Sequence, residues 1–453
     1  MSKSPQTSHS EWSSRFAFIL AATGSAVGLG NIWKFPYITG QNGGGAFVMV
    51  YLVCVLILGI PIMIAEIMLG RRGRQSPINT MQTLAEEAGA DPRWRYSGWL
   101  GMIAGFLILA YYSVIAGWSM AYIAKAFFGQ FLGGGGAEIK TLFDDLMASP
   151  VQQIFWHTLF MLLTMQVVMR GVKGGLEKSV QVLMPALFFI LLILVGYAMA
   201  SGSYRQGIDF LFTPDFSKIN ANAVLTAMGH AFFTLSLGMG AIMVYGSYLP
   251  KHVSIAKTTF YIAGADTVVA LLAGIAIFPL VFANHLEVGS GPGLIFQTLP
   301  LAFGEMSGGW LFGVLFFILL FLAALTSSIS LIEPTVAWLV ENRSLDRRQA
   351  CLWSGAACWL LGVAVVFSFN IWSGHKIFDR NLFEILDYLT ANLMLPIGGL
   401  SIAIFAGRIM KTENCTQELE MPASAFDVWR LLIRYVSPAL IFLVFLHVLG
   451  ALG

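Results

Sequence analysis

Charge is what this sequence has least of. Only 11% of its 453 residues are Asp, Glu, Lys or Arg, and the formal net charge is +2. Charges this few and this balanced exclude a nucleic-acid partner held by electrostatics. A soluble domain carries about 25% charged residues, whereas this chain is 57% hydrophobic with a mean hydropathy of +0.75. We therefore expect a membrane protein with several spans, surrounded by the lipid bilayer.

Three further absences narrow the class of protein. The four cysteines (Cys54, Cys351, Cys358 and Cys415) show no paired spacing, so we expect free thiols and no disulfide framework. No apolar signal-peptide core precedes Phe16. The seven histidines are scattered, and neither an HExxH nor a GxSxG motif is present. The sequence therefore predicts no enzyme, and nothing in it indicates an obligatory protein partner.

The most prominent feature of the sequence is a series of long apolar runs. A transmembrane helix needs ~20 mostly apolar residues, and the chain contains eleven such runs. We thus predict an all-α polytopic membrane protein with eleven transmembrane helices. Their expected ranges are 14–37, 45–70, 97–128, 152–170, 176–200, 225–249, 257–284, 309–341, 348–370, 382–406 and 427–450.

The basic residues orient these spans. With the N-terminus in the cytoplasm, 19 of the 26 Lys and Arg residues fall inside, which the positive-inside rule favours. An odd number of spans then places the C-terminus outside. The two N-x-S/T sequons, at Asn342 and Asn414, would face the cytoplasm, so we expect a bacterial plasma (inner) membrane. The basic residues left outside are Lys34, Lys125, Lys140, Arg205, Lys218, Lys376 and Arg380.

Two of the predicted helices are interrupted by glycine. The first contains "GSAVGLGN" (24–31), and the sixth contains "TLSLGMGA" (234–241). The sixth helix comes five spans after the first. Because five is an odd number, the second set of five helices would enter the membrane from the opposite face. Interrupted helices at matching places in two such halves are typical of inverted-repeat transporters, with a binding site near the midplane. The expected divisions are 1–13 (cytoplasmic segment), 14–200 (first repeat), 201–224 (extracellular connection), 225–406 (second repeat) and 407–453 (cytoplasmic loop and helix 11).

An interrupted helix offers ligands to small ions. Unwinding one turn frees carbonyl oxygens, which suit Na⁺, and amide hydrogens, which suit a carboxylate. The alternative is that Gly24 and Gly28 form a G-x-x-x-G packing motif, which lets two helices approach closely. That alternative does not account for Gly30, for Asn31 or for the second interruption in the sixth helix.

Three motifs in order resemble the neurotransmitter:sodium symporter family. They are "AATGSAVGLGNIWKFPYITGQNGGGAF" in helix 1, "HAFFTLSLGMGAIMVYGSYL" in helix 6 and "LAALTSSISLIEP" in helix 8. The resemblance runs from about Trp12 to the tenth helix and is closest to the bacterial amino-acid branch, typified by the bacterial leucine transporter. Many members have a twelfth helix that this chain lacks, but that helix lies outside the repeats.

The resemblance implies two Na⁺ sites and one substrate site. It assigns the first Na⁺ site to Ala26, Asn31, Thr234 and Asp266, and the second to Gly24, Val27, Ala323, Thr326 and Ser327. It also implies gate residues, Lys34 and Asp387 on the outside and Trp12 and Glu341 on the cytoplasmic side. The substrate residues that it implies are Ala26, Leu29, Gly30, Ile108, Tyr112, Phe233, Thr234, Ser236, Met239, Ser328 and Leu331.

The function that the resemblance implies is inward symport of hydrophobic L-amino acids, aromatic ones included, with Na⁺ by alternating access. Chloride-dependent relatives have Asn and Ser where this chain has Asp266 and Ala270, so no chloride requirement is expected. Two alternatives remain, an amino-acid sensor of the same fold that does not transport, and a symporter for another small zwitterion. Glu66 and Glu333 also lie in apolar spans, where helix-packing hydrogen bonds are at least as good an interpretation as a functional role.

Overall fold

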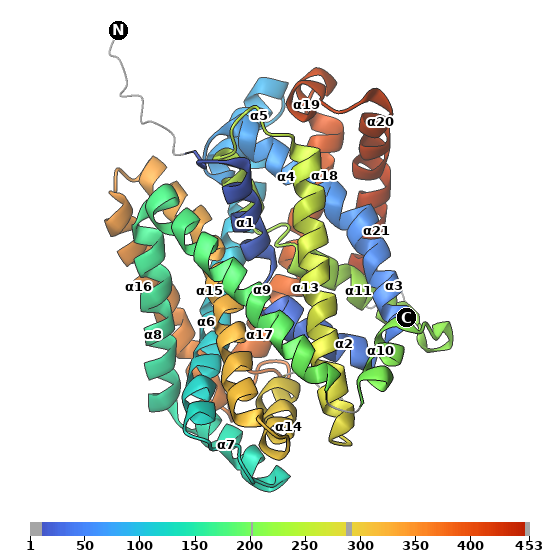
Figure 1. Cartoon of the computed structure of the whole chain (residues 1–453). Coiled ribbons are helices and arrows are strands. Elements are labelled where there is room, and N and C mark those ends of the chain that lie inside the picture. Colours follow the sequence, from blue (N-terminus) through green and yellow to red (C-terminus); the bar gives the residue numbers. More distant parts are fainter. Residues whose placement is uncertain (1–10, 201–202, 287–291, 449–453) are drawn as a thin grey trace.

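The computed structural model describes residues 11–200, 203–286 and 292–448, and these residues are helical almost throughout (Figure 1). Apart from helices they contain two isolated β-bridges, Gly44 with Pro214 and Ile377 with Arg380. The helix bounds agree with the predicted apolar runs to within a few residues wherever a run is continuous.

The elements follow the predicted spans in order. The first half comprises α1 Arg15–Ala26, η1 Gly30–Lys34, α2 Phe35–Gln41, α3 Gly45–Cys54, η2 Val55–Gly59, α4 Ile60–Gly73, α5 Pro77–Ala88, η3 Pro92–Trp94, α6 Arg95–Phe127, α7 Gly136–Ala148, α8 Pro150–Met169, η4 Val172–Glu177 and α9 Lys178–Met199. Next come α10 Tyr204–Phe212, η5 Phe216–Lys218, α11 Ala221–Thr234, α12 Ala241–Ser247, α13 Ile255–Ala283, η6 Leu294–Thr298, α14 Leu299–Glu305 and α15 Gly309–Asn342. The chain continues with α16 Arg347–Phe369, α17 Leu382–Tyr388, η7 Leu389–Met394, α18 Leu395–Ile404, η8 Phe405–Ile409, α19 Thr412–Leu419, α20 Ala423–Leu431, η9 Leu432–Val436 and α21 Ser437–Val448.

Eight helices in the described residues are long and apolar enough to cross a membrane. The pair Arg15–Ala26 and Gly30–Gln41, bent by 50°, makes a ninth if it counts as one span. The predicted spans 225–249 and 427–450 are not among these nine. The first of them is divided into α11 and α12, of 14 and 7 residues. The count of eleven and the inverted repeat therefore stay predictions.

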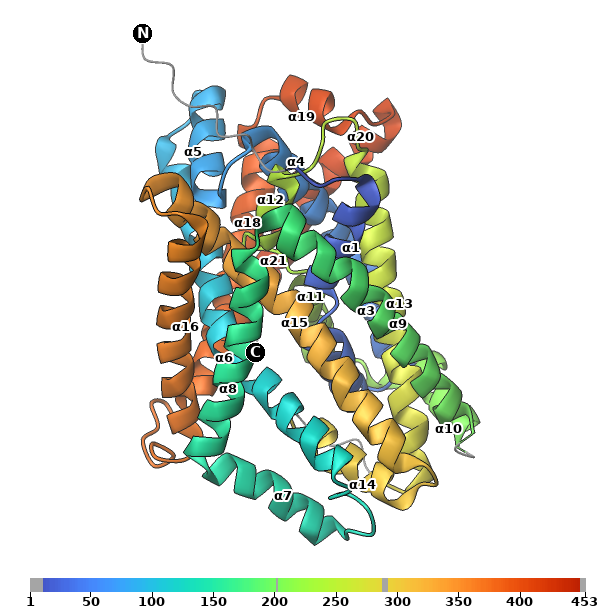
Figure 2. The same cartoon turned by 60° about the vertical axis from the view of Figure 1, so that its left-hand side comes forward.

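Short helices cap both ends of the bundle (Figures 1 and 2). We call the end with α5 and α19 the α5 end, and the opposite end, where α7 and α14 lie, the α7 end. The distribution of basic residues predicts that the α5 end is cytoplasmic. A search for long apolar runs misses such helices because they are short and amphipathic. In α5, for example, Ile78, Met81, Leu84 and Ala85 face inward at helical spacing.

The centre of the bundle is built from α6 and α15, which pack against each other. Small residues allow the close approach, and a Cβ on Gly105 would lie 3.2 Å from the carbonyl oxygen of Leu331. The interrupted helices lie beside this pair, since α1 contacts both α12 and α15. Packing thus places both interruptions in the interior of the protein.

Candidate binding site at the interrupted helices

The first helix is interrupted between α1 and η1. Val27 ends α1 with an extended backbone (φ −70°, ψ 104°), and helical geometry resumes at Gly30. A Cβ on Gly28 would lie 2.5 Å from Ser327 Oγ and 2.8 Å from Tyr112 Oη, so glycine is required by close approach. This interruption leaves backbone carbonyl and amide groups directed at neighbouring helices.

The interruption between α11 and α12 uses left-handed backbone geometry. Ser236, Gly238 and Gly240 have φ values of +54°, +76° and +76°. A Cβ on Gly238 would lie 2.5 Å from the carbonyl oxygen of Leu395, so both conformation and space demand glycine there. Ser236 Oγ donates a hydrogen bond of 2.9 Å to the carbonyl oxygen of Ser25. The two interruptions therefore touch.

A buried carboxylate joins three helices beside this contact. Asn31 Nδ2 donates to Asp266 Oδ1 at 2.7 Å, and Thr234 Oγ1 donates to both Asp266 carboxylate oxygens at 3.1 Å. The amide of Gly28 in turn donates to Asn31 Oδ1 at 3.0 Å. The structure thus brings together the three side chains predicted for the first Na⁺ site.

The second predicted Na⁺ site lies where α15 meets the end of α1. Ser327 Oγ lies 3.4 Å from the carbonyl oxygen of Gly24 and 3.2 Å from that of Val27. Thr326 Oγ1 donates to the carbonyl oxygen of Ala323 at 3.1 Å. Ser327 thus meets carbonyl oxygens at the end of α1, and Thr326 lies beside it, with its Cβ 3.3 Å from where a Cβ on Gly24 would lie.

The chemistry of both clusters fits Na⁺. Hard cations prefer oxygen ligands, and these clusters offer carbonyl, hydroxyl, amide and carboxylate oxygens. Within residues 11–200, 203–286 and 292–448, no group of three or more His, Cys, Asp and Glu side chains could hold a metal ion. The oxygen atoms of these clusters, which include one carboxylate, therefore suit a hard cation such as Na⁺.

A small pocket of about 20 Å³ lies between the interruptions. Every predicted substrate residue lines it except Leu29 and Ser328. Leu29 faces the next cavity outward, and its amide donates to Tyr112 Oη at 3.1 Å. Ser328 turns away, donating to the carbonyl oxygen of Leu325 and bonding to Thr164 Oγ1 at 2.9 Å. The lining residues are Ser25, Ala26, Gly28, Gly30, Ile108, Tyr112, Phe233, Thr234, Ser236, Met239, Ser327 and Leu331.

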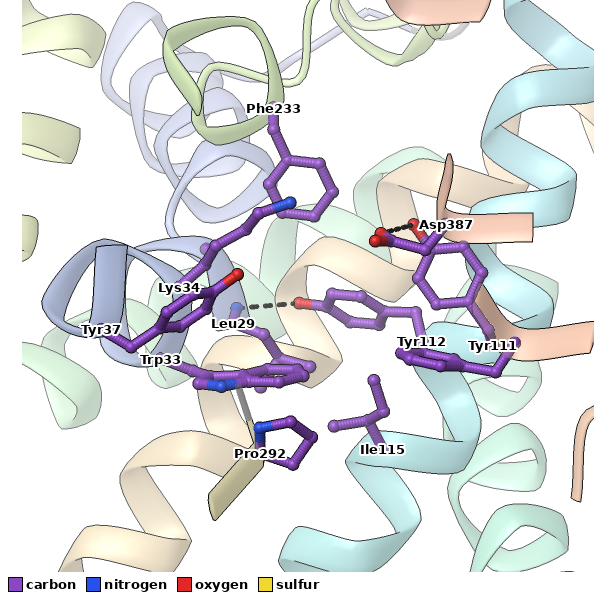
Figure 3. A pocket seen from close by; sticks show the side chains of 12 residues that line it. Leu29, Trp33, Lys34, Tyr37, Tyr111, Tyr112, Ile115, Phe233, Pro292 and Asp387 are labelled. Atoms are coloured by element: carbon purple, nitrogen blue, oxygen red, sulfur yellow. Dashed lines mark hydrogen bonds between the residues drawn. The ribbon is translucent and has the colours of Figure 1, made fainter. Parts of the chain in front are cut away.

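A larger cavity of about 200 Å³ continues from this pocket, with Tyr112 and Phe233 lining both (Figure 3). The two predicted outer gate residues lie on opposite sides of it. Lys34 Nζ lies over the Phe233 ring, 4.7 Å from its centroid, and Asp387 Oδ1 accepts a 3.3 Å hydrogen bond from Tyr111. Within the described part of the chain, Lys34 and Asp387 line the same cavity without forming an ion pair.

Comparison with known proteins places this geometry in a family. A profile of the sodium:neurotransmitter symporter family matches residues 9–132 and 144–452. The chain belongs to the sodium:neurotransmitter symporter family.

Individual relatives extend over nearly the whole chain. The uncharacterized sodium-dependent transporter YhdH of Bacillus subtilis is 36% identical, covering 98% of each chain. An uncharacterized sodium-dependent transporter of Methanocaldococcus jannaschii is 31% identical over 95% of this chain and 88% of its own. The crystal structure of MhsT in complex with L-phenylalanine matches with a TM-score of 0.90 and 41% identity, over 97% of this chain and 99% of that one.

Trp12, one of the two predicted cytoplasmic gate residues, is buried at the α5 end of this symporter. Its indole Nε1 donates to the carbonyl oxygen of Tyr245 at 3.1 Å, and its amide donates to that of Tyr248 at 3.1 Å. The other predicted gate residue, Glu341, accepts hydrogen bonds from the amide of Ser76 (2.8 and 2.9 Å) and from Asn79 Nδ2 (2.8 Å). The two gate residues thus lie at the same end and bind different elements, α12 and α5.

A buried ion pair at this end was missed by the sequence analysis. Arg347 Nη2 lies 2.6 Å from Glu333 Oε2, and Tyr248 Oη donates to Glu333 Oε1 at 2.9 Å. Arg347 Nε also donates to the carbonyl oxygen of Val168 at 2.7 Å. The sequence did contain a signal for this pair: Glu333 lies in an apolar span, and Arg347 stands at the start of the next span. The pair connects α15, α16, α8 and the end of α12.

Two other buried acidic residues of the symporter, Glu66 and Glu177, accept hydrogen bonds from neighbouring elements. Glu66 on α4 is fully buried, and its Oε1 accepts a 2.6 Å hydrogen bond from the amide of Gly238. It therefore satisfies a backbone group that the α11–α12 interruption leaves free. Glu177 accepts hydrogen bonds from the amide and the hydroxyl of Ser13, which ties the start of α1 to η4.

Proposed function

We propose that the protein carries hydrophobic L-amino acids, aromatic ones included, into the cell together with two Na⁺ ions and without chloride. The observation that carries this proposal is the contact between the two helix interruptions, with an oxygen cluster on either side of one small pocket. The likeness to MhsT in complex with L-phenylalanine supports an amino acid as substrate. Asn31, Thr234 and Asp266 would hold one ion, and Thr326 and Ser327 would help to hold the other.

Two ions provide enough energy for strong accumulation. Each Na⁺ gains about 2.3 kcal/mol per 100 mV of membrane potential and about 1.4 kcal/mol per tenfold concentration gradient. Two ions moving down both gradients thus supply ~7 kcal/mol, which corresponds to ~10⁵-fold accumulation of a zwitterion.

A free amine should not replace the amino acid. Relatives that carry amines place an Asp at position 28, where this chain has glycine in close contact with Ser327 and Tyr112. The substrate carboxylate must then complete the first Na⁺ site itself. We expect decarboxylation of a good substrate to abolish Na⁺-dependent binding, measured by competition against radiolabelled L-phenylalanine. An amine that competes as well as its parent amino acid would refute this assignment.

The pocket should accept apolar side chains of differing shape. Met239 lines it together with Ile108 and Leu331, and methionine adapts to irregular shapes because its chain is unbranched. In the same competition assay we expect Leu, Ile, Phe and Trp to displace the label and Asp and Lys to leave it bound. Displacement by Gly and Ala alone would contradict the proposal.

Helix α9 should act as the cytoplasmic door. It starts after Gly174 and Gly175 and contains Pro185, which removes a helical hydrogen bond. Met184 Sδ would lie only 3.2 Å from a Cβ on Gly24, so this segment covers the second Na⁺ cluster. We expect hydrogen exchange at residues 176–184 to be slower with Na⁺ than with K⁺, while a mid-α6 peptide stays constant. Equal exchange of residues 176–184 in the two salts would remove this role.

Uptake separates a transporter from a sensor of the same fold. The purified protein is reconstituted into liposomes, and L-phenylalanine binding and accumulation are both measured with an inward Na⁺ gradient. We expect accumulation that collapses when the gradient is dissipated. Na⁺-dependent binding without accumulation would identify a sensor instead.

A further inference from the structure

Three arginines lie on η8, α20 and η9, where η8 packs against η9 and η9 continues the helix from α20. Helix α20 lies at the α5 end, outside the binding site (Figure 1). The three arginines are Arg408, Arg430 and Arg434. Gly407 allows η8 to pack against η9, because a Cβ there would lie 3.0 Å from the Cα atom of Arg434. The guanidinium groups of Arg408 and Arg434 lie 5.8 and 5.6 Å from the centroid of the same ring, that of Tyr435. The cluster is thus fixed by backbone packing.

These three arginines have no ion-pair partner among the described residues. By contrast, Arg71, Arg72, Arg74 and Arg347 at the same end all form ion pairs. Arg430 Nη1 and Arg434 Nε are also buried without a hydrogen-bond partner. A buried, unpaired donor on a charged group is costly, and three like charges repel one another. An anion from outside the chain would therefore stabilise the cluster, by accepting hydrogen bonds from the unpaired guanidinium groups and by reducing their mutual repulsion.

The position of the cluster indicates which anion. Arg430 and Arg434 lie roughly 10 and 16 Å along the helix that starts at Ala423, given 1.5 Å per residue. Their neighbours Leu431 and Tyr435 are 56% and 53% exposed, as expected of side chains that face lipid. Arginines at this depth reach toward the headgroup layer. The anions of that layer are lipid phosphates.

We propose that Arg408, Arg430 and Arg434 bind the phosphate of an anionic phospholipid in the leaflet at the α5 end. Guanidinium groups hold phosphate oxygens through paired, charge-assisted hydrogen bonds. Leu431 and Tyr435 offer an apolar surface beside them for the acyl chains. The bound lipid joins η8 to η9 and neutralises the cluster, and this role is independent of the transport proposal.

The test is native mass spectrometry and thermal denaturation of the full-length protein with phosphatidylglycerol, phosphatidylcholine or inorganic phosphate. We expect phosphatidylglycerol alone to bind and stabilise. A basic residue near an anionic surface is worth about fivefold in affinity. The triple variant Arg408→Gln, Arg430→Gln, Arg434→Gln should therefore lose the preference for phosphatidylglycerol by on the order of 100-fold. If that variant fails to fold, the exposed Arg408→Gln alone should lose about fivefold.

The matched control replaces Arg93, Arg95 and Arg343 by Gln, three exposed arginines at the same end. It should keep the preference for phosphatidylglycerol. The proposal is wrong if the cluster variants bind phosphatidylglycerol like wild type, or if the control loses as much binding. Equal stabilisation by inorganic phosphate would also overturn it, because the site would then bind a soluble anion.

Discussion

The Asp266→Asn variant should either lose Na⁺-driven uptake or become stimulated by chloride, and the wild type should transport at full rate with gluconate in place of chloride. Asp266 accepts hydrogen bonds from Asn31 and Thr234 and is fully buried. It is the one carboxylate among the residues assigned to the two Na⁺ sites. Replacing it by Asn keeps the shape of the site and removes its charge.

The physical reason is repulsion between the ions. Two cations several ångströms apart repel by ~2–3 kcal/mol even at an effective dielectric constant of ~20. Chloride-dependent relatives balance this with a bound anion, whereas by our proposal Asp266 would provide a fixed one here. Ala270, one turn further along α13, is buried and offers no hydroxyl to a chloride ion.

The control is Asp209→Asn, which removes an exposed carboxylate on α10 that pairs with Arg205. This variant should transport like wild type with or without chloride. A wild type that stops in gluconate would contradict the assignment. So would an Asp266→Asn variant that transports normally in gluconate.

Breaking the ion pair between Glu333 and Arg347 should open the α5 end and destabilise the protein. Losing one partner of a buried pair costs about 3–5 kcal/mol. Because the Arg347 side chain is 24% exposed, we expect Glu333→Gln to cost roughly 3 kcal/mol. Cys351 lies one turn after Arg347 on α16 and is buried. Its alkylation, measured by peptide mass spectrometry, should rise sharply in the variant.

Two controls separate opening from general unfolding. Cys358, two turns deeper on α16, should stay unlabelled. Glu87→Gln breaks an exposed pair with Arg72, worth about 0–1 kcal/mol, and should change neither stability nor labelling. Adding Arg347→Gln to Glu333→Gln should restore part of the lost stability. Wild-type stability and Cys351 labelling in Glu333→Gln would show that the pair does not hold this end closed.

Much of the architecture could be predicted because a helix that crosses the membrane must consist mainly of apolar residues, which are visible in the sequence. A span needs an unbroken apolar run, so most bounds follow to within a few residues. The glycines also indicated where helices 1 and 6 are interrupted. The structure gives the reason at Gly238, where a positive φ and a close backbone contact both require glycine. The resemblance to the family, carried by helices 1, 6 and 8, identified Asn31, Thr234 and Asp266 as candidate ligands, and the structure brings these three side chains together.

What the sequence could not provide was side-chain direction and partners distant in the chain. Ser327 and Ser328 are neighbours, yet helical rotation turns Ser327 toward Gly24 and Ser328 toward Thr164 on α8. The hydrogen bond from Gly238 to Glu66 spans 172 positions. Such contacts depend on how helices pack, which apolar runs alone do not specify.

The most direct test of sodium-coupled symport is simultaneous measurement of labelled Na⁺ and labelled L-phenylalanine entering proteoliposomes. We expect the two fluxes to rise together, with two Na⁺ ions for each amino acid, and both to stop in the Asp266→Asn variant without chloride. L-Phenylalanine entry that does not require Na⁺, or Na⁺-dependent binding with no entry, would contradict the account.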